Sequence, residues 1–400
     1  MRVLQINSVC GYGSTGRIAT DIHKILVEAG HESYIAYGRG EARNIDEKYA
    51  IKIGSKMDNY FHVAKTRIFD KHGLGSIQTT KDFIKKVERL NPDVIHLHNI
   101  HGYYLNYQIL FEYLKKVQKK VIWTLHDCWT FTGHCSHYDY INCQKWQTEC
   151  SSCPQKKEYP QSVLFDNSKE NFKLKKEIFL GINDLTIVTP SEWLAKEVKK
   201  SFLKDYSIKV INNGIDIDIF KPTKSNFKKK YDLENKFLIL GIASIWGERK
   251  GFQYFMELAD KISEDEKIVM VGLTKDQLEK LPKNILGIER TNSQKELAEI
   301  YSAVDVFINP TLEDNFPTTN LETLACGTPG ITFKTGGSPE CFDEKTGIVI
   351  EKGNFEGLHN AIQEIKRNGK DKYSEECRRR AESFYFKGDR FEEYVEEYKK

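Results

Sequence analysis

Residues 304–333 of the chain are VDVFINPTLEDNFPTTNLETLACGTPGITF. The stretch begins with a short apolar run, continues as a polar loop, and then carries a helix that Gly-Thr-Pro ends before the next apolar run. This strand–loop–helix–strand order is the repeating unit of a parallel sheet covered by helices on both faces. The stretch therefore predicts a doubly wound α/β sheet in this part of the chain.

The same unit repeats toward both ends of the chain. In the second half we expect buried strands at Phe237–Ile242, Ile268–Val271, Val304–Ile308, Gly330–Phe333 and Ile348–Ile350. In the first half we expect them at Val3–Ile6, Ser33–Ala36, Val94–Leu97, Val121–Leu125, Leu185–Val188 and Lys209–Ile211. Two such series predict two Rossmann-like lobes facing a cleft, with a ligand held between the carboxyl ends of both sheets.

Composition shifts mark the boundaries between these parts. We expect a first lobe at 1–213, a linker at 214–235, a second lobe at 236–370 and a helical segment at 371–400. The linker is rich in Asn, Gly, Asp, Pro and Lys and shows no periodicity. The last segment is charged but carries aromatic residues at Phe384, Tyr385, Phe386, Phe391, Tyr394 and Tyr398, so we expect it to pack, and to return to the first lobe.

Bulk properties exclude several classes of protein. A chain of 400 residues has room for two domains of about 150–200 residues each. The net charge of +3 is too small to indicate nucleic-acid binding. There is no signal-peptide pattern and no run of about 18 apolar residues, so we expect a soluble cytoplasmic protein. Basic stretches at 115–120 and 172–176 are either solvated helix faces or contacts to the inner face of the cell membrane.

Residues 11–16, GYGSTG, match the glycine pattern of dinucleotide-binding sites, after a strand and before a helix. Such a site also needs an acid at the end of the second strand, and that strand runs into Gly38 and Arg39 instead. Arg39 could receive a 2′-phosphate, so an NADP-dependent oxidoreductase remains an alternative. More generally, the glycines let backbone amides approach an anion at a helix N-terminus.

Asp314 and Glu322 stand eight positions apart, one before the predicted helix and one inside it. The helix N-terminus is a seat for a pyrophosphate, and carboxylates on either side of it suit sugar and ribose hydroxyls. Two acids near a helix start also fit simple capping.

The whole block resembles the acid-x7-acid signature of glycosyltransferase family 4, retaining enzymes of the two-lobed GT-B type. Similar motifs run along nearly the full chain, at 11–16, 126–127, 189–191, 213–216, 249–251 and 309–329. The segments HNIHGYY at 98–104 and LHDCW at 125–129 resemble the subgroup of bacterial colanic-acid and capsule biosynthesis. Two departures are Asp314, where Glu is usual, and the lack of an Arg in residues 243–246.

The resemblance implies a hexosyltransferase that uses a UDP- or GDP-sugar donor and needs no cofactor for catalysis. The acceptor would be a growing polysaccharide, such as a capsule or exopolysaccharide, or a lipid-linked oligosaccharide precursor. A nucleotide-sugar epimerase on the same scaffold is a second alternative. The implied catalytic residues are His126, Arg249, Lys250, Asp314 and Glu322. The implied donor-binding residues are Gly13, Ser14, Thr15, Gly16, Arg17, Asn315, Phe316, Pro317, Thr318 and Thr319.

Two further patterns concern metals. An insertion at 127–160 holds Cys135, Cys143, Cys150 and Cys153, and the last pair has the C-x2-C spacing of half a zinc site. Structural zinc, disulfides and free thiols all remain open there. Residues 216–218 spell D-x-D, a metal motif of single-lobed glycosyltransferases, but their place in the predicted linker argues against that role.

Overall fold

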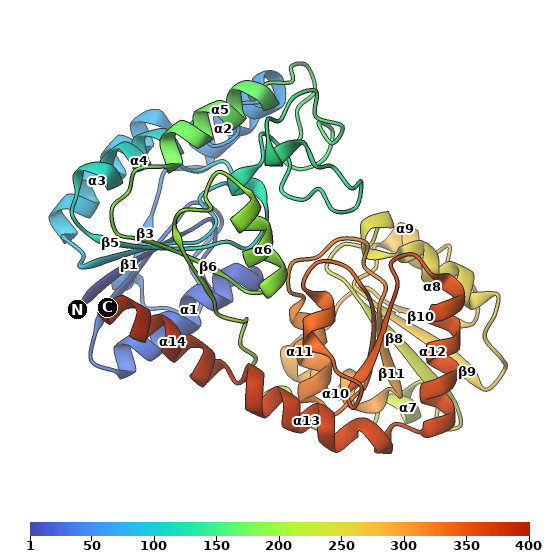
Figure 1. Cartoon of the computed structure of the whole chain (residues 1–400). Coiled ribbons are helices and arrows are strands. Elements are labelled where there is room, and N and C mark those ends of the chain that lie inside the picture. The colour runs from blue at the N-terminus through green and yellow to red at the C-terminus, as the bar shows by residue number, and fades with distance from the viewer. The chain divides into compact units, whose positions relative to one another are not determined.

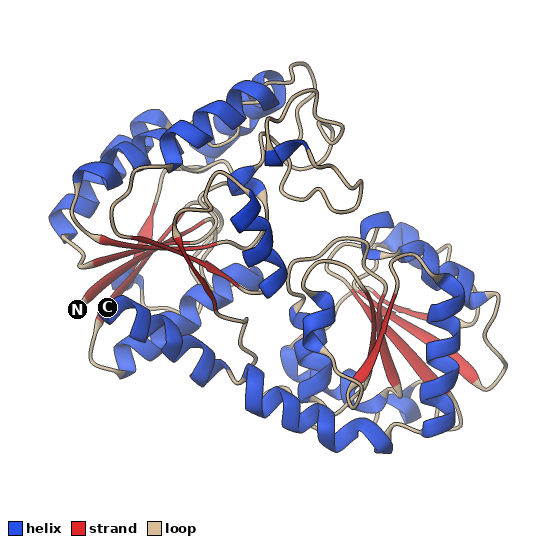
Figure 2. Ribbon diagram, in the orientation of Figure 1, coloured by secondary structure: helices blue, strands red, loops and turns tan.

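The computed structural model describes all 400 residues and divides into two compact units. The first unit comprises Met1–Asn212 and Arg390–Lys400, and the second comprises Asn213–Asp389. Each unit has a central twisted sheet with helices on both faces (Figures 1 and 2). The predicted fold class, two Rossmann-like parallel sheets, is confirmed.

The sheet of the first unit has seven strands, and every neighbouring pair is parallel. The strands are β1 (Arg2–Asn7), β2 (Glu32–Tyr37), β3 (Ala50–Lys52), β4 (Val94–Leu97), β5 (Lys120–Thr124), β6 (Leu185–Thr189) and β7 (Ser207–Val210). Their spatial order is β3-β2-β1-β4-β5-β6-β7. The central strands are almost continuously buried because both faces of a parallel sheet are covered.

Helices connect these strands. They are α1 (Gly13–Glu28), α2 (Lys56–Phe69), α3 (Ile77–Leu90), α4 (Tyr107–Lys116), α5 (Ser168–Phe179) and α6 (Glu192–Lys200), with short 3₁₀ turns η1 (Glu47–Tyr49), η2 (Trp129–Phe131) and η3 (Lys145–Gln147). The insertion expected at 127–160 contains η2 and η3 and otherwise consists of turns and loops.

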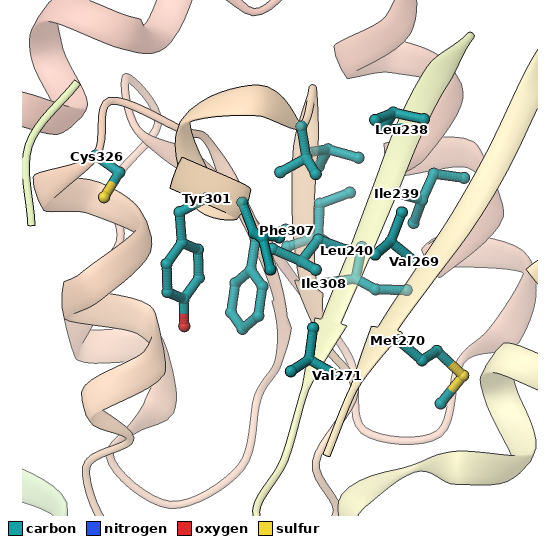
Figure 3. Packing of buried hydrophobic residues seen from close by; sticks show 14 of the residues in the cluster. Leu238, Ile239, Leu240, Val269, Met270, Val271, Tyr301, Phe307, Ile308 and Cys326 are labelled. Atoms are coloured by element: carbon teal, nitrogen blue, oxygen red, sulfur yellow. The ribbon is translucent and has the colours of Figure 1, made fainter. Parts of the chain in front are cut away.

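The second unit has a six-stranded parallel sheet in the order β10-β9-β8-β11-β12-β13. Its strands are β8 (Phe237–Ile242), β9 (Glu266–Val271), β10 (Ile285–Ile288), β11 (Val306–Asn309), β12 (Gly330–Phe333) and β13 (Gly347–Ile350). Its helices are α7 (Phe227–Lys230), η4 (Glu248–Lys250), α8 (Phe252–Ala259), α9 (Lys275–Leu278), α10 (Gln294–Ala303), α11 (Thr318–Ala325), η5 (Ser338–Cys341), α12 (Phe355–Asn368) and α13 (Asp371–Tyr385). Figure 3 shows Leu240, Val269 and Phe307 packing between the sheet and the helix pair that carries Tyr301 and Cys326.

The segment predicted as a linker, 214–235, lies inside the second unit. Ile215, Phe220, Phe227 and Leu233 are all buried in its core, so the non-periodic stretch is anchored by isolated apolar side chains. Ile215 also pairs with Phe386 in an isolated parallel bridge.

The C-terminal segment contributes to both units. Helix α13 packs on α11 of the second unit, whereas α14 (Lys387–Lys399) places Arg390–Lys400 on the first. Thr124 on β5 donates to the Tyr394 hydroxyl at 3.2 Å, so the Thr124 oxygen accepts from His96 Nε2 of β4 at 2.8 Å. His96 Nδ1 is then the acceptor for the Tyr398 hydroxyl at 2.6 Å. These contacts account for two of the aromatic residues of this segment, Tyr394 and Tyr398.

The strand order locates the loops that carry chemistry. In each sheet the chain direction across the sheet reverses next to the first strand, between β1 and β4 and between β8 and β11. Ligands of open α/β sheets bind beyond the carboxyl ends of the strands at such a switch point. The loops after β1, β4, β8 and β11 are therefore the expected location of a ligand site.

Candidate active site

In the second unit, the loops after β8 and β11 bring the predicted cations to the predicted acid. Lys250 Nζ lies 2.5 Å from Asp314 Oδ2. Arg249 Nη1 lies 3.6 Å from Glu313 Oε1, and the Arg249 carbonyl accepts from the Leu312 amide at 2.8 Å. The backbone thus joins the two loops, and two cationic side chains lie among carboxylates at the switch point.

Glycines allow this close approach. Gly251 has a φ of +75°, and a Cβ there would lie 2.2 Å from the Pro310 carbonyl oxygen. Gly336 has a φ of +55°, and a Cβ there would lie 1.7 Å from the Asp314 carbonyl oxygen. A side chain at either position would push the β8 or β12 loop away from the β11 loop.

The second predicted acid, Glu322, lies within α11 and is only 7% exposed. Its Oε2 accepts a hydrogen bond from the Tyr301 hydroxyl of α10 at 2.9 Å. In the same helix, the Asn320 side chain accepts from Asn309 Nδ2 at 2.9 Å and donates to Ser338 Oγ at 3.0 Å. These buried polar contacts fix the rotation of α11, and therefore the direction of its carboxylate.

The predicted donor-binding stretch before α11 is largely inside the protein. Asn315, Phe316 and Pro317 are buried, while Thr318 and Thr319 in the first turn of α11 are half-buried. The Phe316 ring packs 6.0 Å from the ring of Tyr385, so its side chain belongs to the core. The first-turn amides of α11 are the groups of this stretch that suit a phosphate.

In the first unit, the glycine loop forms the entry to α1. The Gly11 amide donates to the Gly16 carbonyl at 3.0 Å, and Gly11 has a φ of +74°. Gly13, Ser14 and Arg17 are exposed, whereas Thr15 accepts a hydrogen bond from Asn7 Nδ2 of β1 at 3.3 Å. The exposed positions are the ones available to a ligand.

His126 follows β5 and is the last member of a short hydrogen-bonded chain. Gln5 Nε2 donates to the Ala19 carbonyl at 2.9 Å, which fixes the amide and leaves Gln5 Oε1 as an acceptor. His98 Nε2 lies 3.0 Å from that oxygen, and His98 Nδ1 lies 3.1 Å from His126 Nε2. His98 must therefore carry its proton on Nε2.

The charges of the two imidazoles follow from their surroundings. Burial holds the pKa of His98 well below its ordinary value, so Nδ1 of the neutral ring accepts from His126 Nε2–H. Burial also lowers the pKa of His126 to about 4, although the Asp127 carboxylate acts in the opposite direction. At neutral pH His126 is thus uncharged, with Nδ1 as a hydrogen-bond acceptor.

Asp127 is ionised, and both of its carboxylate oxygens have partners within the protein. Burial alone would raise the pKa of this carboxyl, but the neighbouring His101 imidazole and the Trp129 amide lower it to about 2. His101 Nε2 lies 2.9 Å from Asp127 Oδ2, and the Trp129 amide donates to Oδ1 at 2.9 Å. Asp127 therefore orders the chain next to His126.

The four cysteines predicted as zinc ligands line one small cavity, together with His134. The thiols of Cys135 and Cys153 are hydrogen-bonded to each other, and the Gly133 amide donates to Cys150 Sγ at 3.2 Å. Every cysteine of the chain is a free thiol. As the side chains stand, no group of three or more His, Cys, Asp or Glu residues is positioned to hold a metal ion.

The D-x-D sequence at 216–218 has a structural role. Asp216 Oδ1 accepts from the amides of Asp218 and Ile219, at 3.0 and 3.1 Å, and Oδ2 pairs with Lys387 Nζ at 2.7 Å. The motif thus forms a turn that fastens the start of α14.

Comparisons with known proteins agree with this architecture. The family model described as Glycosyltransferase Family 4 matches residues 15–219, and that of Glycosyl transferases group 1 matches residues 236–368. The chain is 24% identical over 369 residues to the putative colanic acid biosynthesis glycosyl transferase WcaC of Escherichia coli K12, covering 88% of each chain.

Solved structures share the fold at low sequence identity. Sucrose-phosphate synthase from Thermosynechococcus elongatus superposes with a TM-score of 0.73 at 14% identity, over 100% of this chain and 98% of the other. HepE from Anabaena, solved in complex with UDP, gives a TM-score of 0.68 at 14% identity over 99% of both chains.

Two parallel-sheet units with these matches define a glycosyltransferase of the GT-B type. Within that class, the chain belongs to Glycosyltransferase Family 4. The first of the alternatives considered from the sequence, an oxidoreductase, is thereby replaced by a transferase.

Proposed function

We propose that this enzyme is a retaining hexosyltransferase that uses a UDP- or GDP-sugar and extends a polysaccharide or a lipid-linked oligosaccharide precursor. The observation that carries the proposal is the cluster of Lys250, Arg249 and Asp314 at the switch point of the second sheet. The similarity to WcaC supports a bacterial polysaccharide as the product, and the UDP complex of HepE supports a uridine nucleotide.

The reaction breaks the bond between the anomeric carbon and a phosphate oxygen, and forms a bond from that carbon to an acceptor hydroxyl oxygen. The leaving diphosphate gains negative charge, which Arg249, Lys250 and the amides at the start of α11 would stabilise. Lys250 would exchange its contact with Asp314 for the phosphate, which releases the carboxylate to bind sugar hydroxyls.

The family resemblance supplies the stereochemistry. In retaining enzymes of this type the acceptor enters on the face that the leaving group vacates, and a departing phosphate oxygen takes the hydroxyl proton. We assign Glu322 to the ribose hydroxyls. We assign His126 to the donor sugar, because its neutral Nδ1 can accept a hydrogen bond from a sugar hydroxyl.

A panel of donors tests the proposal. UDP-, GDP- and ADP-hexoses and NADP are screened by thermal shift at millimolar concentration, and the best ligand is assayed for slow hydrolysis. A nucleotide sugar at 100 times its Kd should stabilise the fold by about 2.7 kcal/mol. Stabilisation by none of the nucleotide sugars would contradict the proposal, and an epimerised sugar nucleotide without transfer would favour the epimerase.

We also propose structural zinc at Cys135, Cys143, Cys150 and Cys153. Their shared cavity and the amide hydrogen bond to Cys150 Sγ support it, and the side chains would have to turn toward one another to complete the site. Metal analysis of purified protein should give one zinc per chain, and none after Cys150→Ser with Cys153→Ser. Absence of zinc from the unaltered protein would remove the proposal.

A further inference from the structure

Helix α2 has its polar side inside and its apolar side outside. His62 and Thr66 face the interior, where His62 Nε2 accepts from two backbone amides at 3.0 and 3.2 Å. On the opposite face Met57, Tyr60 and Phe61 are 60%, 68% and 70% exposed. A surface helix of a globular protein normally buries its apolar face, so this reversed pattern needs a partner outside the unit.

The exposed apolar residues form one stripe along the helix. Met57, Tyr60, Phe61, Ala64 and Ile68 follow the spacing i, i+3, i+4, i+7 and i+11, which places them on a single face. The helix is well terminated, since Ser55 and Asp58 form a capping box at its start. The stripe is thus presented by a stable helix.

A loop extends this stripe. The Val163 amide donates to the Arg67 carbonyl at 2.7 Å, and the Phe165 amide donates to the Ile68 carbonyl at 3.2 Å. The rings of Phe69 and Phe165 stack with centroids 5.9 Å apart. Val163, Leu164 and Phe165 are all exposed beside the end of α2.

We call these residues the apolar ridge: Met57, Tyr60, Phe61, Ala64, Ile68, Phe69, Val163, Leu164 and Phe165. The ridge holds eight of the 17 large exposed apolar side chains of the chain, five on α2 and three in the loop. Such a concentration on one helix and one loop is characteristic of an interaction surface.

The charged residues around the ridge are mainly basic. The exposed cations on α2, and in the chain just after α2 and just before Val163, are Lys56, Arg67, Lys71 and Lys157. The acids are mostly engaged within the protein, because Asp58 caps α2, Asp70 is buried against His134 and Asp166 accepts from the Cys153 amide. Glu158 and Asp166 are the exposed acids near the ridge, so the exposed cations there outnumber the exposed acids by four to two.

The basic stretch at 172–176, which the sequence offered as a possible membrane contact, is partly buried and does not belong to the apolar ridge. Phe172 is buried, and the buried Lys175 Nζ donates to the Trp129 and Thr132 carbonyls at 2.6 and 3.1 Å. That stretch therefore presents only part of its charge to solvent.

We propose that the apolar ridge docks into the surface of an anionic lipid bilayer, with its aromatic and aliphatic side chains at the boundary between headgroups and acyl chains. The exposed cations on its rim would then meet lipid phosphates. An exposed amphipathic helix with aromatic residues and flanking Lys or Arg has the composition of elements that lie in a membrane interface. No helix of the chain is long and apolar enough to cross a bilayer, and docking of this kind requires none. The proposal stands apart from the sugar-transfer activity.

Co-sedimentation of the full chain with phosphatidylcholine vesicles, with and without phosphatidylglycerol, tests the proposal. The test variant combines Tyr60→Ser, Phe61→Ser and Leu164→Ser. The matched control combines Val349→Ser and Phe384→Ser, which removes exposed apolar side chains of the second unit. Both variants alter exposed residues, so thermal melting should be unchanged.

The unaltered chain and the control should sediment with phosphatidylglycerol vesicles, less so at high salt, and the test variant should bind at least tenfold more weakly. Failure of the unaltered chain to bind, or equal binding by the test variant, would overturn the proposal. A dimer that sedimentation velocity detects in the unaltered chain and not in the test variant would instead assign the ridge to self-association. Because vesicle binding is measured without any sugar donor, its failure leaves the proposed function untouched.

Discussion

Replacing Gln5 tests how the first unit prepares His126. Gln5→Met keeps the length of the side chain but removes the donor to the Ala19 carbonyl and the acceptor for His98 Nε2–H. His98 can then place its proton on Nδ1 and donate to His126 Nε2. The proton of His126 would move to Nδ1, and the acceptor that we assign to the donor sugar would be lost.

The magnitudes follow from these contacts. Two buried hydrogen bonds at about 0.5–1.5 kcal/mol each predict that the free energy of unfolding falls by about 1–3 kcal/mol. Loss of one hydrogen bond from a sugar hydroxyl to His126 costs about 0.5–1.5 kcal/mol in the transition state, which lowers kcat/KM by about 2- to 12-fold. A matched control is Thr66→Val, which breaks a buried hydrogen bond in α2 that has no link to His126.

The direct assay is nitrogen NMR of protein labelled with ¹⁵N-histidine. His126 of the unaltered chain should remain the neutral Nε2–H tautomer from about pH 5.5 to 8, because burial lowers its pKa to about 4. Gln5→Met should shift it toward the Nδ1–H tautomer, and Thr66→Val should not. Titration of His126 near pH 6.5, or an Nδ1–H tautomer in the unaltered chain, would refute this reasoning.

Three further outcomes follow from the first unit. Gly11→Ala should destabilise the fold by about 2 kcal/mol or more, because Gly11 has a left-handed φ and a Cβ there would clash with a carbonyl oxygen. Gly13→Ala, which has open space around it, should cost only about 1 kcal/mol. Chemical denaturation measures both values. Tyr398→Phe should lower the free energy of unfolding by about 1 kcal/mol, because His96 Nδ1 loses its donor. Burial lowers the pKa of His96 and His98, so the unfolded state binds more protons than the folded state below about pH 6.5. Urea titrations should therefore show that the free energy of unfolding decreases as the pH is lowered through that range. Constant stability from pH 7 to 5 would contradict the last expectation.

Much of the fold could be predicted because buried parallel strands are short apolar runs between helices. The expected strands coincide with eleven strands of the structure to within a few residues at each end. The sequence pattern missed β3 and β10, which are edge strands with partly exposed residues, so neither shows a fully apolar run. The segment 214–235 was expected to be a linker because its core residues, such as Phe220 and Phe227, stand alone without periodicity.

The candidate site was predictable in part. Loops that follow adjacent strands meet at one sheet edge, so Lys250 and Asp314 could be placed together from the strand pattern. The contact of Tyr301 with Glu322, and the chain from Gln5 through His98, join helices and strands whose side-chain directions the sequence does not specify. The close approach of Gly336 to the Asp314 carbonyl had one signal in the sequence, the Gly-Gly pair just after a strand.

In the proposed function, Lys250 and its neighbours hold the diphosphate of a nucleotide sugar. Calorimetric titration of the best donor from the thermal-shift panel into the unaltered chain and into Lys250→Met measures this directly. The expected result is micromolar binding by the unaltered chain and a Kd at least tenfold higher in Lys250→Met, since a charge-assisted hydrogen bond contributes about 1.5–3 kcal/mol. Equal Kd values for both proteins would contradict the account.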